Sequence, residues 1–244
     1  MLLTLLAFAQ PKSELAPPPP IPPAEGERQA HELLDRLLAQ KPDQSLTNTG
    51  TLTIRDAQGQ QRTISARFDI AVAPTHWTSV YVAAPAPTFG GEEFAVLHYD
   101  LTNQYRLVLG TNRQARSLTG DQLMVPFAQS DFWLADLGLE FLHWPAQRIV
   151  KKQMRKNLFC DVLQSANPHP APGAYSRVVT WIAANRPDEI IVVHADAYDF
   201  AGKLLKEFDP KRVEKINGVW QLEAMEIRNR QTGSRTRIDF NLEK

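Results

Sequence analysis

Residues 235–242 read RTRIDFNL and carry the clearest strand pattern of the chain. Thr236, Ile238, Phe240 and Leu242 alternate with charged or amide side chains, so one face of this stretch is mostly apolar and the other is polar. Clean alternation of this kind is typical of an antiparallel sheet with one face toward a core and the other toward water. The stretch therefore predicts an antiparallel β-strand.

The same alternation continues toward the N-terminus through most of the chain. Turn sequences separate the segments, and Asn217-Gly218 is the strongest short hairpin signal among them. Strands are expected at residues 51–55, 64–72, 77–82, 94–99, 105–109, 148–154, 158–165, 175–183, 189–199, 203–208, 212–215, 220–228 and 235–242. A sheet of this width tends to curl or to close on itself. The expected fold class is α+β, dominated by one curved antiparallel sheet.

Two segments depart from the strand pattern and predict helices. Residues 27–40, ERQAHELLDRLLAQ, form an amphipathic helix with four leucines on one face. In the middle of the chain, residues 119–123 predict a helical turn, and a helix is expected over Asp131–His143, between Ser130 and Pro145. Because the inner face of a curved sheet needs a cover, we expect the mid-chain helix to lie across it.

The amino terminus has the features of an export signal followed by a linker. Residues 2–9, LLTLLAFA, are far shorter than the roughly 20 apolar residues that span a bilayer. They match the apolar part of a secretory signal with a cleavage site at Ala7-Phe8-Ala9, and a disordered apolar start is the alternative. Residues 10–26 hold seven of the 18 prolines and predict an extended linker, or else a ligand for a proline-reading domain. Residues 27–244 are expected to form a single domain.

The composition argues against several classes of function. Lys+Arg and Asp+Glu each number 27, which argues against nucleic acid as the main partner. The single cysteine, Cys160, excludes an internal disulfide framework and zinc sites with two or more thiolates. It lies far from the amino terminus, so an exported chain is expected to be soluble rather than anchored by an acyl group.

Sequence motifs for catalysis are also missing. The chain has no dinucleotide-binding, phosphate-binding, nucleophile-elbow or H-E-x-x-H motif. Its six histidines are scattered, although a metal site assembled across strands is the alternative. Cys160 lies in an apolar strand and is interpreted as a small buried hydrophobe, with a nucleophile as the alternative. We therefore predict no enzyme activity, no metal and no cofactor.

A basic stretch follows the mid-chain segment. It consists of Arg148, Lys151, Lys152, Arg155 and Lys156. These residues are interpreted as the solvated face and tip of a hairpin. The alternative is contact with anionic lipid headgroups, which attract clustered lysine and arginine side chains.

The carboxy-terminal half also carries a series of short motifs. They are Ser130-Asp131-Phe132, Cys160-Asp161-Val162-Leu163, Tyr175-Ser176-Arg177-Val178 before Trp181, residues 198–206 (YDFAGKLLK), Gly218-Val219-Trp220, Met225-Glu226-Ile227-Arg228-Asn229 and Thr232-Gly233-Ser234-Arg235-Thr236. In order and spacing, residues 128–244 resemble the LolA-like superfamily of outer-membrane lipoprotein-sorting proteins, which are bacterial periplasmic carriers. The resemblance implies an incomplete, half β-barrel closed by helices and an apolar cavity that shields acyl chains. One departure is residues 73–77, APTHW, which keep the proline of that family's lid latch and lack its arginine.

Two functions of different classes follow from the resemblance and the pattern together. The first is a non-catalytic, monomeric periplasmic carrier of lipid or lipidated protein, with an inner-membrane donor and an outer-membrane acceptor. Its expected cavity residues are Trp77, Phe132, Trp133, Leu137 and Phe141, each of which is ordinary core in the alternative interpretation. The second is a structural or sensing envelope module that binds a partner protein with the same sheet. Lipid in an extract of the purified protein favours the carrier, and a fully packed interior favours the module.

Overall fold

The computed structural model describes residues 20–99, 102–110, 114–186, 189–216 and 219–242. The expected signal at residues 1–9 and the first part of the expected linker, residues 10–19, lie outside these ranges. None of the helices in the described part of the chain has the length and apolar composition needed to cross a membrane.

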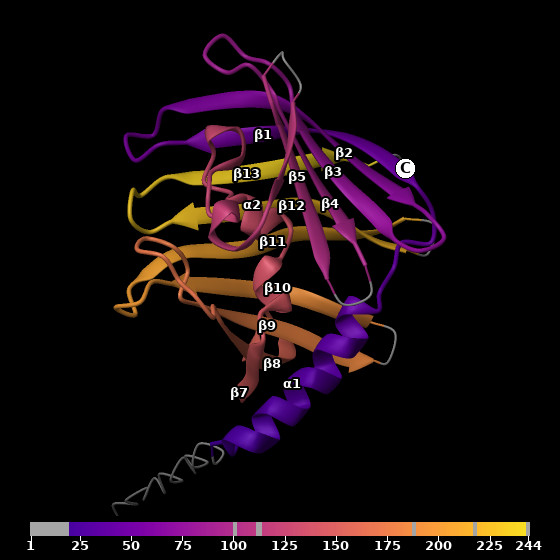
Figure 1. The fold of residues 1–244 in the computed structure, drawn as a ribbon, viewed down its shortest axis with the longest axis vertical. Helices are drawn as coiled ribbons and strands as arrows, with labels where there is room; N and C mark the ends of the chain where they lie inside the picture. The colour runs from indigo at the N-terminus through magenta and orange to yellow at the C-terminus, as the bar shows by residue number, and fades with distance from the viewer. Residues whose placement is uncertain (1–19, 100–101, 111–113, 187–188, 217–218, 243–244) are drawn as a thin grey trace, which may run out of the picture.

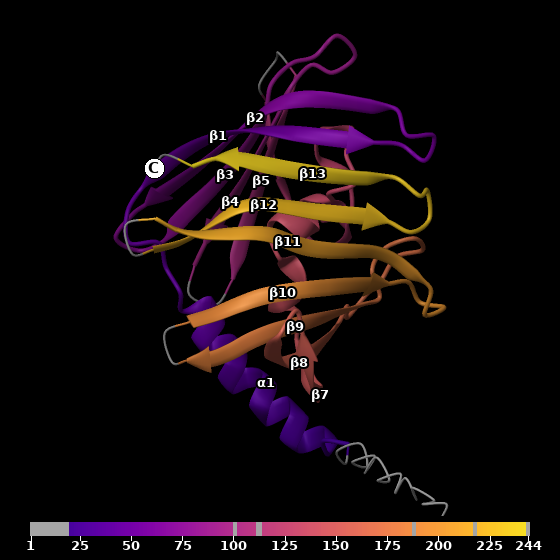
Figure 2. The same cartoon turned by 180° about the vertical axis from the view of Figure 1, so that it is seen from behind.

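The described chain forms one 13-stranded antiparallel sheet in the order β6-β5-β4-β3-β2-β1-β13-β12-β11-β10-β9-β8-β7. Its strands are β1 (Leu46–Arg55), β2 (Gln61–Val72), β3 (Trp77–Ala83), β4 (Glu92–His98), β5 (Asn103–Leu109), β6 (Ala115–Leu118), β7 (Ala146–Arg155), β8 (Leu158–Ala166), β9 (Arg177–Arg186), β10 (Glu189–Tyr198), β11 (Leu204–Ile216), β12 (Val219–Asn229) and β13 (Arg235–Asn241). Figures 1 and 2 show β3, β4 and β5 crossing the direction of β11, β12 and β13 at a steep angle. The sheet is therefore strongly curved, and in the described residues its edge strands β6 and β7 do not pair to close it. The expected curved, incomplete barrel is confirmed.

The alternating pattern predicted the strands well. In β13, Ile238 faces Leu52 of β1 on one side and Met225 of β12 on the other, and all three side chains are buried. The two strands expected at 203–208 and 212–215 are one strand, β11, which stays paired with β12 through register shifts on both sides of Arg212. Strand β6 was not expected, because only the last of its four residues is buried and no alternation marks it.

Helix α1 (Pro23–Leu38) confirms the predicted amino-terminal helix and begins four residues earlier than expected. Residues 23–26, assigned to the linker, are therefore helical. The helix packs on β7 so closely that a Cβ atom at Gly26 would lie 2.5 Å from the carbonyl oxygen of Ile149. Glycine at this position allows the helix backbone to approach the edge of the sheet.

Residues 119–145, called the central segment below, cross the concave face of the sheet (Figure 1). The continuous helix predicted over Asp131–His143 is wrong. The segment instead contains three 3-10 turns, η1 (Gly120–Leu123), η2 (Phe127–Gln129) and η3 (Glu140–His143), and one α-helical turn, α2 (Leu134–Leu137). Helix α2 is stopped by Gly138 and by Leu139, whose φ of +48° is left-handed. The turn predicted at 119–123 is confirmed by η1.

The central segment contributes to two buried clusters on the concave face. In the first, Phe127, Phe132 and Leu134 pack with side chains of β1–β6, β12 and β13. In the second, Phe141 and Leu142 pack with α1 and with side chains of β7–β11. The segment therefore joins the two halves of the curved sheet.

Candidate functional site

The five residues predicted to line a cavity lie in two different environments. Phe132, Leu137 and Phe141 are buried between the central segment and the sheet, and Trp133 is partly buried beside them. Trp77 lies on β3 and is partly buried at another place. The structure thus brings four of the five together over the concave face, and their role in binding stays a prediction.

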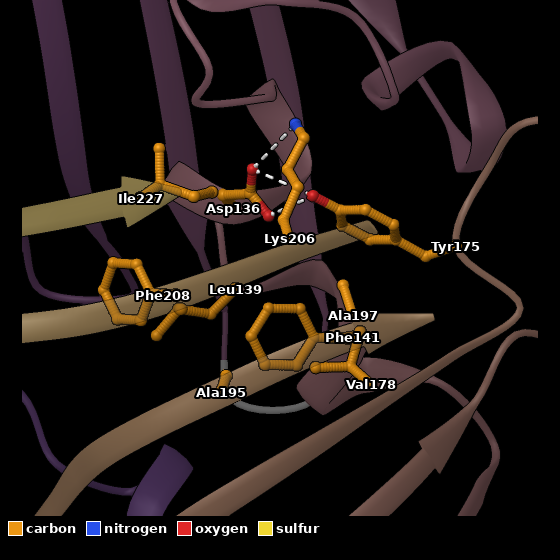
Figure 3. Close-up of a pocket in the computed structure, with 10 residues that line it drawn as sticks. All are labelled: Asp136, Leu139, Phe141, Tyr175, Val178, Ala195, Ala197, Lys206, Phe208 and Ile227. Atoms are coloured by element: carbon orange, nitrogen blue, oxygen red, sulfur yellow. Dashed lines mark hydrogen bonds and ion pairs between the residues drawn. The ribbon is translucent and has the colours of Figure 1, made fainter. Parts of the chain in front are cut away.

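The space beneath the central segment is small. A cavity of about 10 Å³ lies there, lined by Asp136, Phe141, Tyr175, Lys206 and Phe208 among others (Figure 3). A cavity of that size has room for about one water molecule. The apolar cavity of about 300 Å³ that a ligand of modest size needs is therefore not open beneath the segment in the described part of the chain. Side chains of the protein itself fill the concave face.

A buried lysine joins the segment to the sheet. Lys206 on β11 is 2% exposed, and its Nζ donates a hydrogen bond to the backbone oxygen of Asp131 at 2.7 Å. The same Nζ lies 3.7 Å from Asp136 Oδ2 and 3.6 Å from the centre of the Trp133 ring. Burial lowers the pKa of Lys206 to about 8, against the opposing effect of the nearby carboxylates. One cation therefore contacts three residues of the central segment.

Asp136 is the acidic partner in this cluster. The hydroxyl group of Tyr175 donates to Asp136 Oδ1 at 2.9 Å (Figure 3). The N–H group of Trp133 donates to Asp136 Oδ2 at 2.7 Å. Burial raises the pKa of Asp136, and the charge of Lys206 opposes that rise. The rings of Trp133 and Tyr175 stack with their centres 4.5 Å apart. Acid, base and aromatic rings thus form one buried group, called the latch cluster below: Trp133, Asp136, Tyr175 and Lys206.

Further polar contacts hold the start of the central segment. Asp131 accepts hydrogen bonds from the hydroxyl groups of Thr236 at 2.8 Å and Ser234 at 2.5 Å. Glu92 on β4 accepts one from the N–H group of Ala128 at 2.8 Å. Burial raises the pKa of Glu92 to about 7. These groups tie the segment to β4 and to the start of β13.

Strands β3 and β5 bind the middle of the segment. Tyr81 on β3 donates a hydrogen bond to the backbone oxygen of Leu137 at 3.2 Å. Asn103 on β5 donates one to the backbone oxygen of Gly138, also at 3.2 Å, and the hydroxyl group of Tyr105 donates to Glu140. The segment is therefore held by hydrogen bonds with side chains of β3, β4, β5, β11 and β13 and not by apolar packing alone.

A groove opens at one end of the concave face, between the C-terminal end of α1, strands β3–β5 and η3. Its volume is about 220 Å³, and its apolar lining includes Leu38, Trp77, Leu139 and Leu142. The Trp77 ring stacks on that of His98 with centres 3.6 Å apart. Burial lowers the pKa of His98 to about 4, so this histidine is neutral near pH 7. Trp77 is thus the predicted cavity residue that faces open space.

One cluster with potential for metal binding lies on the other face of the sheet, among the described residues. His194 Nε2 is 2.6 Å from Asp196 Oδ1, its Nδ1 is 2.8 Å from Asp209 Oδ1, and Glu207 is close by. Lys156 pairs with Asp209 at 3.1 Å, and Arg230 pairs with Glu207. Cations of the protein therefore already balance these carboxylates, and the absence of a metal site stays a prediction.

Cys160 is fully buried, and burial raises the pKa of its thiol. A nucleophilic cysteine needs a lowered pKa, so the environment fits the small-hydrophobe interpretation.

Sequence reasoning missed the latch cluster. Lys206 and Asp136 are 70 positions apart in the sequence, and nothing local marks them as partners. The one available signal was the position of Lys206 in its strand, two residues from Phe208 and so on the same face. A lysine on an apolar face requires a buried partner, and that reasoning would have directed attention to the acidic residues of the central segment.

Comparison with known proteins identifies a family and a fold. A model of one protein family, described as "Uncharacterized protein", matches residues 81–242. No curated protein matches the sequence.

Three solved structures share the architecture. A domain from Vibrio parahaemolyticus, described as belonging to an outer membrane lipoprotein-sorting protein, is 17% identical with a TM-score of 0.71, and the match covers 91% of this chain and 92% of that one. A DUF1329 family protein from Desulfovibrio piger is 21% identical with a TM-score of 0.68, covering 88% and 91%. A LolA superfamily protein from Nitrosomonas europaea is 13% identical with a TM-score of 0.59, covering 89% and 92%. The chain therefore has the LolA-like fold that its motifs predicted, and it belongs to the protein family whose model matches residues 81–242.

Proposed function

We propose that this protein is a non-catalytic carrier of the bacterial envelope, which shields the acyl chains of lipids or lipidated proteins from water. The observation that carries the proposal is the central segment. It covers the apolar concave face of an open sheet without joining the sheet, and polar side chains hold it in place. Similarity in fold to the V. parahaemolyticus lipoprotein-sorting domain and to the N. europaea LolA superfamily protein supports the same function.

Loading of this carrier requires the central segment to move. The cavity beneath it, about 10 Å³ in volume, is too small for an acyl chain. The groove of about 220 Å³ beside Trp77 holds part of a chain and gives an entrance. Each methylene group transferred from water contributes about 0.8 kcal/mol. An acyl chain that enters from the groove therefore takes over the contacts that Phe132, Leu137 and Phe141 make with the sheet when the segment is closed.

The cellular setting follows from this activity. We place the protein in the periplasm, where it acts as a monomer between an inner-membrane donor and an outer-membrane acceptor. The latch cluster serves to keep the empty carrier closed. No catalytic residue, metal or cofactor has a part in this function, because binding and release need only the burial and exposure of acyl chains.

A structural or sensing module is the second candidate function. The packed interior beneath the central segment favours it, because a protein that never opens needs no more than the small cavity observed. In that case the concave face is ordinary core, and a partner protein binds elsewhere on the sheet.

Two measurements distinguish these functions. Mass spectrometry of an organic extract of the protein, purified from its native envelope, is expected to show stoichiometric lipid. Uptake of a fluorescent fatty acid is expected to be abolished by Leu137→Asp, because Leu137 lies between the segment and the sheet. Val125→Asp is the matched control, since Val125 belongs to the same segment and is 36% exposed.

The outcomes are separable by circular dichroism. If the protein is a carrier, Leu137→Asp keeps the circular-dichroism signal of the strands and loses the uptake of fatty acid. Trp77→Ser, at the partly exposed wall of the groove, is expected to slow uptake without a change in folding. An extract without lipid, together with wild-type uptake in both variants, contradicts the carrier and favours the partner-binding module.

A further inference from the structure

Two hairpin turns lie side by side at one end of the sheet, where β1 meets β13. The turn between β1 and β2 and the turn between β12 and β13 are neighbours in Figures 1 and 2. A Cβ atom at Gly233 of the second turn would lie 3.4 Å from the Cβ atom of Ala57 in the first. Both turns line an open cleft of about 410 Å³, together with Arg55 and Arg235. The cleft therefore lies where the two halves of the sheet are joined.

The two arginines of this cleft lie opposite each other. Arg55 and Arg235 are the last cross-strand pair between β1 and β13, and both are exposed. Their sequence neighbours Ile54 and Thr236 are buried on the concave face, so alternation places both arginines on the convex face. Residues directly opposite each other in an antiparallel pair have Cβ atoms about 4.5–5.5 Å apart, and like charges at such positions destabilise the sheet. The strand register thus sets two positive charges side by side.

Neither arginine has a carboxylate partner among the described residues. Other arginines on the same face do have one. Arg228, the cross-strand partner of Arg235 on its other side, pairs with Glu226 at 2.9 Å. Arg237, two residues along β13, pairs with Asp239 at 2.6 Å. The repulsion between Arg55 and Arg235 is therefore not balanced by an ion pair as it is for their neighbours.

The turns position the pair without neutralising it. Asp56 also lines the cleft, but its Oδ1 accepts a hydrogen bond from the N–H group of Gln60 at 2.8 Å and so belongs to its own turn. The guanidinium group of Arg55 lies against Gly59, where a Cβ atom would be 3.3 Å from Nη2. Gly59 has a φ of +86°, a left-handed conformation that favours glycine. With one aspartate against two arginines, the lining keeps a net positive charge.

Protection of a sheet edge does not explain this pair. Lysine and arginine on an edge strand prevent pairing with other chains. Strands β1 and β13, however, lie in the middle of the strand order, with further strands paired on both sides. A like-charge pair in that position costs stability and prevents nothing, so we looked for a ligand that would balance it.

The basic stretch predicted from the sequence offers no comparable pair. It lies on the edge strand β7 and the turn after it, where edge protection is a sufficient explanation. Its members each pair with a carboxylate, lie over an aromatic ring or face an uncharged cross-strand partner: Arg148, Lys151, Lys152, Arg155 and Lys156. Their contact with lipid headgroups stays a prediction.

An anion that fits Arg55 and Arg235 needs several acceptor oxygens. Each guanidinium group presents parallel N–H donors that match two oxygens of a carboxylate or a phosphate. A carboxylate satisfies one such fork, whereas the three terminal oxygens of a phosphate monoester accept from two forks at once. We propose that Arg55 and Arg235 bind a phosphate monoester group, carried either by a soluble molecule or by the headgroup of a lipid. This site lies on the face opposite to the central segment and does not depend on the carrier function.

Titration calorimetry of the full chain with glycerol 3-phosphate tests the soluble source. The wild type is expected to bind it, and to bind acetate at least about tenfold more weakly at the same ionic strength. Arg55→Gln and Arg235→Gln are each expected to weaken binding about tenfold, because each removes charge-assisted hydrogen bonds. Arg237→Gln is the matched control, since it removes the same charge from the same face of β13 and Arg237 already has a partner in Asp239. The control is expected to bind as the wild type does.

Vesicle co-sedimentation tests the lipid source. Vesicles of phosphatidylcholine with phosphatidic acid present a phosphate monoester, and vesicles with an equal negative charge from phosphatidylglycerol present a diester. If a lipid carries the phosphate, the wild type sediments with the first vesicles much more than with the second, and both cleft variants lose this preference. Absence of binding to glycerol 3-phosphate and to phosphatidic acid overturns the proposal, and so does an equal loss in the cleft variants and the control.

Thermal unfolding gives an independent measure of the same site. Sodium phosphate is expected to raise the melting temperature of the wild type above its value in sodium chloride of equal ionic strength, and to do so less in either cleft variant. Without phosphate, Arg55→Gln is expected to melt no lower than the wild type, because it relieves the like-charge repulsion. A much lower melting temperature would contradict that repulsion. Fatty-acid uptake is measured separately, so failure of the phosphate site and failure of the carrier function are distinguishable.

Discussion

Lys206→Met tests how the central segment is held, because Lys206 brings a positive charge into the interior and contacts three residues of that segment. Methionine is of similar length and apolar, so it preserves most of the packing. The substitution removes the hydrogen bond to Asp131 at 2.7 Å and the cation above the Trp133 ring. It also leaves Asp136 without the ammonium group that lies 3.7 Å from its carboxylate.

The expected loss of stability is set by the buried carboxylate that remains. Removal of one partner from a buried ion pair costs about 3–5 kcal/mol. Part of this cost is offset, because methionine carries no charge. The buried charge of Lys206 is itself unfavourable, as its pKa of about 8 indicates. We therefore expect a loss of about 3 kcal/mol at neutral pH. For a chain of 244 residues this lowers the melting temperature by about 6–12 °C.

The loss of stability caused by Lys206→Met is expected to grow as pH rises. The charge of Lys206 is the largest influence that lowers the pKa of Asp136, so without it burial raises that pKa further. A folded-state pKa above the unfolded value gives stability that is present below the unfolded pKa and lost as pH rises through the folded pKa. Lys206→Met is therefore expected to be closest to the wild type in acid and furthest from it at neutral pH.

Urea unfolding followed by far-ultraviolet circular dichroism at about pH 5 and about pH 7.5 measures this difference. Addition of Asp136→Asn to Lys206→Met removes the buried charge and is expected to restore most of the lost stability. Lys203→Met, at an exposed position three residues away, is the control for the change of residue type. Wild-type stability in Lys206→Met at neutral pH, or a double variant no more stable than the single one, would refute the reasoning.

Two other changes test the contacts around the central segment and α1. Gly26→Ala is expected to destabilise the protein by about 1–3 kcal/mol, because the new Cβ would lie 2.5 Å from the carbonyl oxygen of Ile149. Thermal unfolding measures this loss, with Glu27→Ala at an exposed position of the same helix as the control. Equal melting temperatures of the two variants would show that α1 does not need its close approach to β7. Glu92 has a pKa raised to about 7 by burial, so its contribution is present below its unfolded pKa and is lost as pH rises through about 7. Glu92→Gln is expected to flatten the dependence of the urea midpoint on pH between about 5 and about 8, and a slope equal to that of the wild type would contradict the assignment.

The strands were predictable because burial alternates along them. Strand β13 shows this best, since its neighbours on both sides repeat the pattern and Ile238 and Phe240 lie on the same face of the sheet. Strand β6 escaped prediction because Leu118 alone is buried in it. The helix expected over Asp131–His143 was wrong for a different reason. The segment is densely apolar because it is buried from several sides, and a high apolar content was interpreted as one helical face.

The candidate site was less predictable than the fold. Phe132, Leu137 and Phe141 were expected to line an apolar cavity; they are buried in the clusters between the central segment and the sheet, and their role in binding stays a prediction. The volume left beneath them depends on how side chains from many strands fit together, which periodicity does not report. The pairing of Lys206 with Asp136 likewise depends on the tertiary fold, since only the curvature of the sheet brings these positions together.

The order of the strands also has a kinetic consequence. With one exception, each neighbour in the sheet is also the next strand along the chain. The exception is the pairing of β1 with β13, where Thr49 meets Asn241 and Arg55 meets Arg235. Contacts between residues close in sequence form quickly, and those between distant residues form late because of their loop-closure entropy. Two separate meanders are therefore expected to grow during synthesis, and they remain unjoined until β13 leaves the ribosome. Until then, the edges of β1 and β12 that β13 will cover are open to pairing with another molecule.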